Sequence, residues 1–378
     1  MRDGREIVIA VIFMLLLIIP TVESVFHVFP EVENNENRAM KELPVLNINE
    51  LDVFPEEFDV FYSDNFDLRN QLLKFNSGMK FNMFNKPPVE GKAFIGEDGW
   101  MYIVKDEMDI YLGNNLANEN KLKRYHDIFK YRKDFLDSIG CVYYVVIVPI
   151  KTSIYPEFLP LSKRKTNQLT LTDQVVNMLD TVDGMNIVDL RSKLVNAKGG
   201  IRLYHKTDNH WNDFGGFIAY QAMIEAIQYD FSIIEPNSIS DYSIDSITKN
   251  GLVLTKMMGI YDGVYENVIT VKKTDIPLSH RGVKRNYPVL KNFPYVNDYE
   301  IVYEVDNDSL PKLMVVRDSF GKSVMPYMSE HFSKSVYIFD GWHHWLNEEI
   351  VLEEKPDIYI QLVLESFLPN VHKHAKNP

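Results

Sequence analysis

The sequence predicts an α/β fold with a mostly parallel sheet, helices on both of its faces and a strand-rich insertion. Two observations support this prediction. Continuous apolar runs rich in β-branched and aromatic residues, such as Val142 to Val148, are typical of strands buried on both faces. Segments with the apolar spacing of helices lie between these runs, and such alternation is typical of parallel sheets. The 46% apolar and 25% charged content is that of a folded globular chain.

The first residues resemble a targeting or anchoring signal. Arg2 and Arg5 precede Ile7 to Ile19, an unbroken apolar run that ends before Pro20. As a helix this run is about 20 Å long, short of the roughly 30 Å hydrocarbon core of a bilayer. A basic flank before an apolar core of this length is typical of signal peptides, and positive charge stays inside. We therefore expect 1–22 to be a signal anchor or signal peptide, rather than a buried helix of a cytosolic domain.

This assignment predicts a cell-membrane protein with a single N-terminal anchor and an extracytoplasmic domain, or a secreted protein if the signal is cleaved. The next segment, 23–90, is acidic, rich in asparagine and interrupted by prolines. Within it, 56–75 has helical spacing of apolar residues. We expect a tether and an N-terminal helical arm here, followed by one catalytic domain over 91–378.

The catalytic domain begins with two short strands joined by a glycine turn, over Gly91 to Ile103. Between about 231 and 308 the pattern is polar and turn-rich without clear strand–helix units, so we expect an insertion there. Gly215 and Gly216 would let a helix approach the neighbouring backbone closely. The other expected elements are strands at 142–148, 185–190, 312–317, 336–339 and 357–364, and helices near 122–136, 168–179, 214–227, 322–331 and 345–352.

Charge and cysteine content exclude several classes of function. The formal net charge of −13 argues against a nucleic-acid partner, because phosphate binding needs a basic surface. It also disfavours simple adhesion to anionic lipid. The single cysteine, Cys141, allows no intramolecular disulfide and is expected to be a small buried side chain. The sequence contains no P-loop, dinucleotide fingerprint or metal-ligand spacing, so we expect neither a cofactor nor a metal.

A polar loop from Tyr204 to Asp213 holds a carboxylate and an imidazole two positions apart. In an extended segment, residues two apart face the same way, so Asp208 and His210 can both project into one site. An imidazole fixed by a carboxylate can take the proton of a serine, which is otherwise a poor nucleophile. Trp211 follows directly and is a candidate for the wall of the site.

The serine that could meet this loop is Ser319, at the point where a predicted strand ends and a helix begins. In open α/β sheets ligands bind at that edge, and a helix N-terminus directs unpaired amides at an oxyanion. The backbone amides of Ser319 and Gly321 are therefore candidate donors. An ordinary helix cap is the alternative interpretation of this segment. Asp318 is an alternative partner for His210, although capping the loop suits it better.

Two further groups are candidates for substrate contact. Lys151 and Tyr155 follow the strand at 142–148, where they either line the same edge or form a surface turn. Trp342 and His343 belong to a Trp-His-His-Trp segment, and aromatic faces stack on sugar rings. Packing of a loop against a helix is the alternative for this segment, and a metal site there lacks supporting ligand spacing.

The stretch Asp208-x-His210-Trp211 resembles the D-x-H-W motif of the SGNH-hydrolase-like proteins of the alginate O-acetyltransferase-like and DHHW superfamily. The segment VVRDSFGKSVMPYMSEHF is similar to their nucleophile segment, and GEDGWMYI, VPIKTSIYPEFLP and PDIYIQLVLESFL fit the same pattern. Arg317 departs from it, because the family usually has glycine before Asp-Ser. The resemblance covers roughly 91–368 and implies a flavodoxin-like fold with Ser319 as nucleophile, His210 as base and Asp208 as orienting acid.

The resemblance also implies a function. We expect an exported, membrane-anchored enzyme that O-acetylates a cell-surface polysaccharide through an acyl-enzyme, with the polysaccharide as acceptor and a membrane-bound O-acyltransferase as acyl donor. Two alternatives stay open at this point. One is a carbohydrate O-acetyl esterase of the same fold, and the other is a non-catalytic polysaccharide-binding or scaffold subunit.

Overall fold

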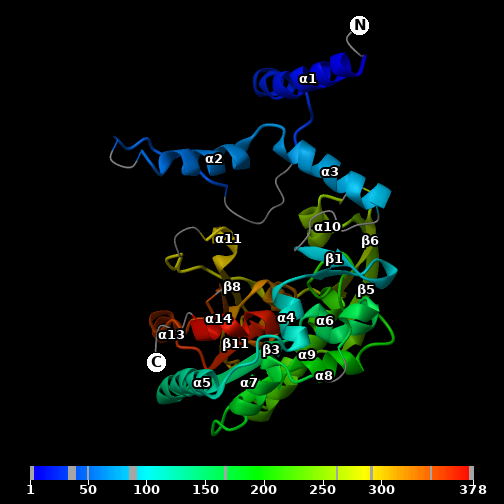
Figure 1. Cartoon of the computed structure of the whole chain (residues 1–378). Coiled ribbons are helices and arrows are strands. Elements are labelled where there is room, and N and C mark those ends of the chain that lie inside the picture. The colour runs from blue at the N-terminus through cyan, green and yellow to red at the C-terminus, as the bar shows by residue number, and fades with distance from the viewer. Residues whose placement is uncertain are drawn as a thin grey trace. The chain divides into compact units, whose positions relative to one another are not determined.

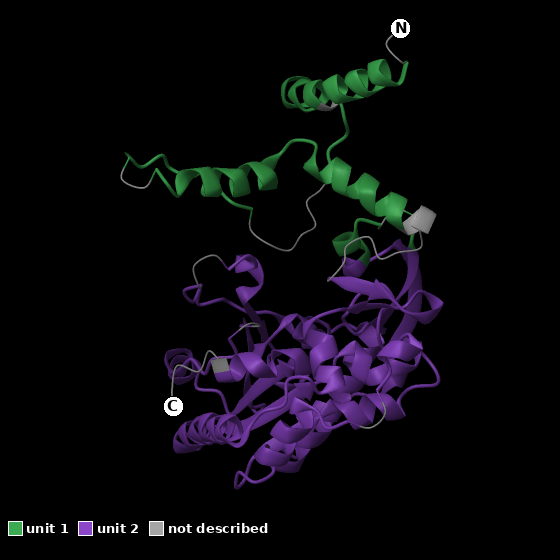
Figure 2. Ribbon diagram, viewed as in Figure 1, with its two compact units in different colours: residues 1–90, 255–264 green, residues 91–254, 265–378 purple. Residues whose placement is uncertain are grey.

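The computed structural model describes residues 4–32, 40–48, 51–84, 92–165, 168–260, 263–289, 293–340 and 343–373. The chain forms two compact units, which are drawn in different colours in Figure 2. Unit 1 comprises 1–90 and 255–264, and unit 2 comprises 91–254 and 265–378. The first boundary falls where the sequence analysis ends the predicted arm and begins the catalytic domain.

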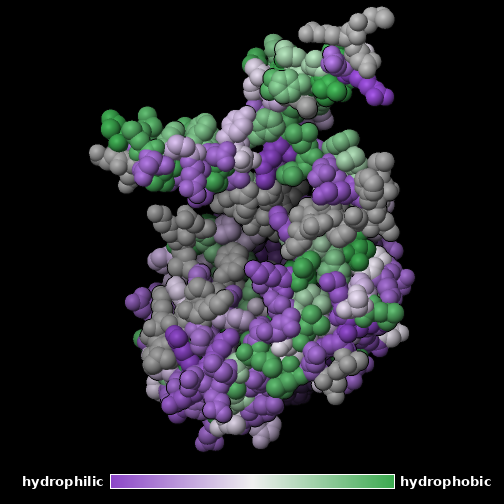
Figure 3. All heavy atoms as spheres, in the orientation of Figure 1, coloured by the Kyte–Doolittle hydropathy of each residue, from purple (hydrophilic) through white to green (hydrophobic). Residues whose placement is uncertain are grey.

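Unit 1 contains the apolar N-terminal segment. Its helix α1, Gly4–Phe26, has a mean hydropathy of 2.6 and is, among the described residues, the one helix long and apolar enough to cross a membrane. A signal sequence passes the same test. The α1 side chains are largely exposed, and hydrophobic residues gather over this helix in Figure 3.

The predicted arm consists of two helices rather than one. Helix α2 is Phe54–Asn65 and α3 is Arg69–Phe84. At Phe66 the backbone is extended, with ψ of 124°, which ends α2. Part of the predicted tether, 33–39, lies outside the described residues.

The core of unit 2 is a seven-stranded sheet with the order β4-β3-β11-β9-β10-β8-β7. Its strands β3, β8 and β11 are labelled in Figure 1. The five strands from β4 to β10 are parallel, while β8 and β7 are antiparallel at one edge. The mostly parallel α/β sheet predicted from the sequence is therefore confirmed. The strands are β3 (Val142–Val148), β4 (Asn186–Asp189), β7 (His280–Arg281), β8 (Glu300–Glu304), β9 (Lys312–Arg317), β10 (Lys334–Phe339) and β11 (Ile358–Leu364).

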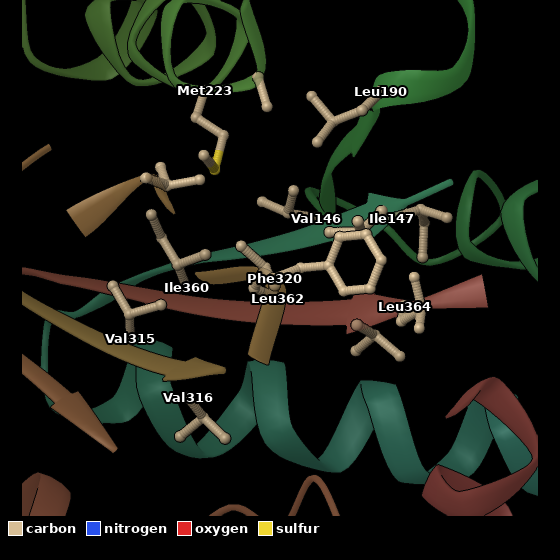
Figure 4. Packing of buried hydrophobic residues seen from close by; sticks show 14 of the residues in the cluster. Val146, Ile147, Leu190, Met223, Val315, Val316, Phe320, Ile360, Leu362 and Leu364 are labelled. Carbon is tan, nitrogen blue, oxygen red and sulfur yellow. The ribbon is translucent and has the colours of Figure 1, made fainter. Parts of the chain in front are cut away.

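Helices cover both faces of this sheet. In Figure 4, Met223 of α9 and Leu190 of α8 lie on one side of the strands, while Val316 points to the other side, toward α5. Neighbouring residues of β9 face opposite sides, so its apolar run packs against both helical layers. The helices are α4 (Asp106–Leu112), α5 (Glu119–Ser138), α6 (Lys151–Ile154), α7 (Leu171–Leu179), α8 (Leu190–Asn196), α9 (Asp213–Asp230), α11 (Val296–Tyr299), α12 (Met325–Met328), α13 (Glu348–Glu354) and α14 (Leu368–Lys373).

Two small antiparallel pairs complete unit 2. Strands β1 (Ala93–Ile95) and β2 (Met101–Ile103) form the predicted N-terminal hairpin. Strands β5 (Tyr242–Asn250) and β6 (Tyr265–Lys273) pair within the predicted insertion, with α10 (Val253–Met258) between them. Both pairs supply residues to the site described below.

Two predictions about the segment from 231 to 331 are wrong. The range 231–308 is not entirely an insertion, because β7 and β8 extend the main sheet beside β10. The helix predicted at 322–331 is instead a 3₁₀ turn, the short helix α12 and a second 3₁₀ turn. Pro326, which has no amide hydrogen, lies at the start of α12 and prevents a continuous helix through this segment.

Candidate active site

The loop that carries Asp208 and His210 is closed at its base by main-chain hydrogen bonds. Tyr204 and Trp211 form an isolated antiparallel bridge, and the Asn212 amide donates to the Leu203 carbonyl at 2.9 Å. Asn212 also caps α9, since its side chain accepts from the Gly215 amide at 3.0 Å. The loop is therefore anchored to a helix on one side.

Gly215 and Gly216, at the start of α9, allow the close approach to neighbouring backbone that the sequence predicts. A Cβ on Gly215 would lie 2.2 Å from the Leu203 carbonyl oxygen. A Cβ on Gly216 would lie 2.8 Å from the Ser323 side chain. The start of α9 therefore packs directly against the segment before the loop and against the turn that carries Ser319.

The structure brings Asp208, His210 and Ser319 together at the carboxyl edge of the sheet. His210 Nδ1 lies 2.7 Å from Asp208 Oδ1, and His210 Nε2 lies 2.7 Å from Ser319 Oγ. Because a carboxylate can only accept, Nδ1 carries the hydrogen and Nε2 is left to accept from the serine hydroxyl. The His210 amide also donates to Asp208 Oδ1 at 3.1 Å, which fixes the carboxylate in place.

Burial and charge act in opposite directions on this pair. Burial by itself would lower the pKa of His210, but the hydrogen bond and charge of Asp208 outweigh it and raise the pKa above the ordinary value of 6.5. Burial likewise favours a protonated Asp208, yet His210 lowers the pKa of this carboxyl to about 2. The acid is therefore ionised at neutral pH and holds the imidazole in the orientation that a general base needs.

A tight turn after β9 presents Ser319, and the loop is fastened to it. The Trp211 indole Nε1 donates to the Phe320 carbonyl at 3.1 Å, and the Phe320 ring lies 4.6 Å from the His210 ring. Phe320 is fully buried among the strands, as Figure 4 shows. Ser319 remains partly exposed. The loop with His210 and the turn with Ser319 are thus joined by buried contacts, while Ser319 itself stays partly exposed.

Asp318 braces the turn through hydrogen bonds to backbone amides, whereas His210 is hydrogen-bonded to Asp208. Its Oδ1 accepts from the Phe320 amide at 2.8 Å and its Oδ2 from the Leu364 amide of β11 at 2.9 Å. Burial raises the pKa of this carboxyl to about 6, although both hydrogen bonds oppose the shift. This arrangement agrees with the capping role that the sequence analysis favoured over a catalytic one.

Arg317, the departure from the family pattern, lies in the interior. Its guanidinium donates to the Asp318 carbonyl at 3.1 Å and to the Asp298 carbonyl at 3.0 Å, over the Phe339 ring. Burial lowers the pKa of Arg317 to about 10. The side chain supports the turn from below, and Gly321 leaves room for it.

Replacing Gly321 by alanine is expected to lower the free energy of unfolding by about 1–3 kcal/mol, as overpacked cores usually do. The added Cβ would lie 2.6 Å from Arg317 Cδ and 2.8 Å from its Cβ, and the Arg317 side chain is held at both ends. Urea unfolding measures the change. The matched control is Gly200→Ala, where a Cβ meets nothing within 4 Å; equal stability of the two variants would contradict this account.

Three residues predicted to contact substrate are instead buried, so this part of the prediction is corrected. Lys151 is 0%, Tyr155 6% and Trp211 1% exposed. The Tyr155 hydroxyl accepts from the Leu203 amide at 3.0 Å, and Lys151 binds three carbonyls of the interior. Lys151 and Tyr155 support the loop that carries Asp208 and His210 (the proposed catalytic loop, 204–213) from behind, and Trp211 closes the base of this loop.

The other two predicted contacts come from the segment after β10. Trp342 lies outside the described residues. His343 is partly exposed, and its Nδ1 lies 3.0 Å from Asp340 Oδ1. The Asp340 amide donates to the Arg317 carbonyl at 3.0 Å, so this segment follows the same edge of the sheet as Ser319. His343 stays a candidate for substrate contact.

Three buried carboxyl groups near the site were missed by the sequence analysis. Glu266 of β6 accepts from the amides of Lys206 and Thr207 at 2.7 and 2.8 Å, which ties the insertion to the catalytic loop. Glu365, after β11, accepts from the Ile150 amide at 2.8 Å. Glu107 of α4 is 2% exposed. In the sequence, nothing separates these glutamates from ordinary surface charges. Among the described residues, no three His, Cys, Asp or Glu side chains are grouped to hold a metal.

Comparison with known proteins shows similarity to one group of acetyltransferases. Residues 93–249 match the family model for the SGNH hydrolase-like domain of the acetyltransferase AlgX. Two proteins named "Probable alginate O-acetylase AlgJ" are similar over 45% of the chain, with 26% identity in Pseudomonas syringae pv. tomato and 25% in Pseudomonas putida. The matched segment spans 41% and 42% of the length of these relatives.

Solved structures show the same fold at low sequence identity. PatB1 of Bacillus cereus superposes with a TM-score of 0.53 at 18% identity, covering 72% of this chain and 96% of that one. A DHHW family protein from Eubacterium siraeum has a TM-score of 0.50 at 14% identity, covering 72% and 94%. Residues 93–249 are thus similar to the SGNH hydrolase-like domain of the AlgX type, and 45% of the chain is homologous to proteins named as probable alginate O-acetylases.

Proposed function

We propose that this protein is a serine O-acetyltransferase that modifies a polysaccharide through an acyl-enzyme. The observation that carries the proposal is the continuous chain from Asp208 through His210 to the Ser319 hydroxyl, with 2.7 Å at each step. Homology to proteins named as alginate O-acetylases supports acetyl transfer and a polysaccharide acceptor. The apolar helix α1 supports attachment to a membrane, with unit 2 on its outer side.

In the proposed first half-reaction, His210 Nε2 takes the Ser319 proton while Oγ attacks the acetyl carbonyl carbon of the donor. The oxyanion that forms lies against backbone amides at the start of the turn. The Phe320 amide is already bound to Asp318, so the amides of Ser319 and Gly321 are the candidate donors. The tetrahedral intermediate then expels the donor's leaving group, which receives the proton from His210, and acetyl-Ser319 remains.

In the second half-reaction a sugar hydroxyl of the acceptor gives its proton to His210 and attacks the acetyl-serine. Collapse releases the O-acetylated sugar, and Ser319 Oγ recovers its proton from His210. Water in place of the sugar gives hydrolysis by the same groups. The choice between transferase and esterase therefore depends on the acceptor site and on exclusion of water, because the catalytic groups are common to both.

The test uses the full-length protein in detergent with p-nitrophenyl acetate as donor, with and without an alginate oligosaccharide. O-acetylated oligosaccharide, detected by mass spectrometry, is the expected product. Release of acetate alone, unchanged by the oligosaccharide, would favour a carbohydrate esterase. If the protein binds the oligosaccharide but does not consume the donor, it is a polysaccharide-binding subunit rather than an enzyme. A membrane-bound O-acyltransferase remains the proposed physiological donor.

A further inference from the structure

Lys151 carries a buried ammonium group directly behind the loop that holds His210. Its Nζ donates to the carbonyls of Met101 at 2.6 Å, Lys206 at 2.9 Å and Asp208 at 2.8 Å. The side chain is fully buried, and the rings of Trp100 and Tyr102 lie 5.2 and 5.1 Å from Nζ. No solvent competes for these three hydrogen bonds.

These acceptors place Lys151 at the junction of two segments. The carbonyls of Lys206 and Asp208 belong to the catalytic loop, and the Met101 carbonyl belongs to β2 of the N-terminal hairpin. The Met101 amide also donates to the Lys206 carbonyl at 2.8 Å. One side chain thus connects the hairpin to the backbone of the residue whose carboxylate orients His210. Three acceptors also require three hydrogens, which only the ammonium form provides.

Among the carboxyl groups around Lys151, Glu107 is the one whose charge would most favour the ammonium form. Glu107 lies on α4 and is 2% exposed. Neither carboxyl oxygen has a hydrogen-bond partner of ordinary geometry among the described residues, although the Asn209 side chain lies close enough to favour the ionised form. Burial raises the pKa of Glu107, and the charge of Lys151 is the largest influence against that shift.

The same opposition appears at Lys151. Burial lowers the pKa of Lys151, while the carboxylates of Glu107, Asp208 and Glu266, in that order, oppose the shift and Arg202 adds to it. These groups come from α4, from the catalytic loop and the segment before it, and from β6. The three carbonyl acceptors favour the charged amine further.

We propose that Lys151 is a positioning residue for the Asp208–His210 pair, because its ammonium group holds the carbonyls of Lys206 and Asp208 against the β1–β2 hairpin. This inference rests on the proposed function, because kcat reports the effect of Lys151 through His210. Lys151 is fully buried and does not touch the substrate. Loss of the Lys151 proton would release one of three carbonyls and loosen the loop that carries His210.

The first test replaces Lys151 by methionine in the full-length protein. Ester turnover is expected to fall in kcat about 10–100-fold with little change in KM, since a misplaced base slows chemistry without affecting a substrate it does not bind. Hydrogen–deuterium exchange over 204–212 should rise whether or not the ester is turned over. The control is Lys130→Met on the exposed face of α5, which should match wild type in both measurements. Wild-type exchange of the loop in Lys151→Met would overturn the proposal.

The second test replaces Glu107 by glutamine, which keeps shape and removes charge, and serves even if Lys151→Met does not fold. The alkaline limb of the kcat profile is expected to move to lower pH by roughly one unit, because the ammonium loses its counter-charge. If Glu107 had a purely structural role, Glu107→Gln would lower the stability of the protein and leave the alkaline limb of the kcat profile unchanged. That result would contradict the role proposed for the Lys151 ammonium. Ser319→Ala in the same assay distinguishes failure of the proposed function from failure of the role proposed for Lys151. If this variant turns over the ester as fast as wild type, the proposed function is refuted. Hydrogen–deuterium exchange of the loop in Lys151→Met then tests the role of Lys151 by itself.

Discussion

Ser319→Ala is expected to lower kcat for acetyl release from p-nitrophenyl acetate by about 10⁴-fold or more, and His210→Ala by a similar factor. Ser319 Oγ is the atom that would form the acyl-enzyme, and His210 Nε2, at 2.7 Å, is the group that would remove its proton. Because the two act in one step, the double variant should be little slower than either single variant.

Steady-state turnover and trapping of the acyl-enzyme by mass spectrometry measure these losses. Ser309→Ala and His126→Ala are suitable controls, since both residues lie on the exposed surface, away from the site. Acetyl attached to the chain at another residue would show that Ser319 is not the nucleophile. Hydrolysis at wild-type rates in Ser319→Ala and His210→Ala would remove the enzyme interpretation altogether.

Asp208→Asn is expected to lower kcat by about 10⁴-fold as well, because the amide can donate to Nδ1 and so stabilise the wrong tautomer of His210. The direction in which activity changes with pH can also be predicted. The base must be neutral to accept a proton, so activity rises as pH increases through the pKa of His210, which Asp208 raises above 6.5. Without that carboxylate the pKa falls, and the acid limb of the residual activity should move to lower pH.

Asp318→Asn is the matched comparison, one residue from the nucleophile. Its carboxylate is bonded to the amides of Phe320 and Leu364 and not to His210. The main effect of Asp318→Asn is expected to be a free energy of unfolding that is lower by about 1–3 kcal/mol. Asparagine has one oxygen and one NH₂ group, so one of the two backbone N–H groups would lose its acceptor and face another donor. A larger loss of kcat in Asp318→Asn than in Asp208→Asn would mean that Asp318 is the orienting acid.

The sequence predicted best where local pattern and tertiary position agree. Strands β3 and β9 begin and end at the predicted residues. Strand β3 is a continuous apolar run stopped by Pro149, and β9 is a shorter apolar run between Lys312 and Arg317. The pairing of Asp208 with His210 also follows from spacing alone. The juxtaposition with Ser319 required the sheet topology, because β9 lies between β10 and β11 and not beside β8, the strand that precedes it in sequence.

What the sequence could not predict depends on burial by distant segments. Lys151 resembles a surface lysine until the β1–β2 hairpin covers it, and Trp211 resembles a sugar-binding aromatic until Phe320 packs against it. Strand β8, with glutamates at both ends, is recognisable only once β10 is beside it. In each case the decisive neighbour is far along the chain.

The indole of Trp211 and the Phe320 carbonyl hold the two catalytic segments as one piece. This bond favours movement of the two segments together rather than separately. Under the proposed function, contacts to a long acceptor then come from residues around this pair, such as the segment after β10. A change of acceptor requires substitutions in those surrounding residues and leaves the reacting groups aligned.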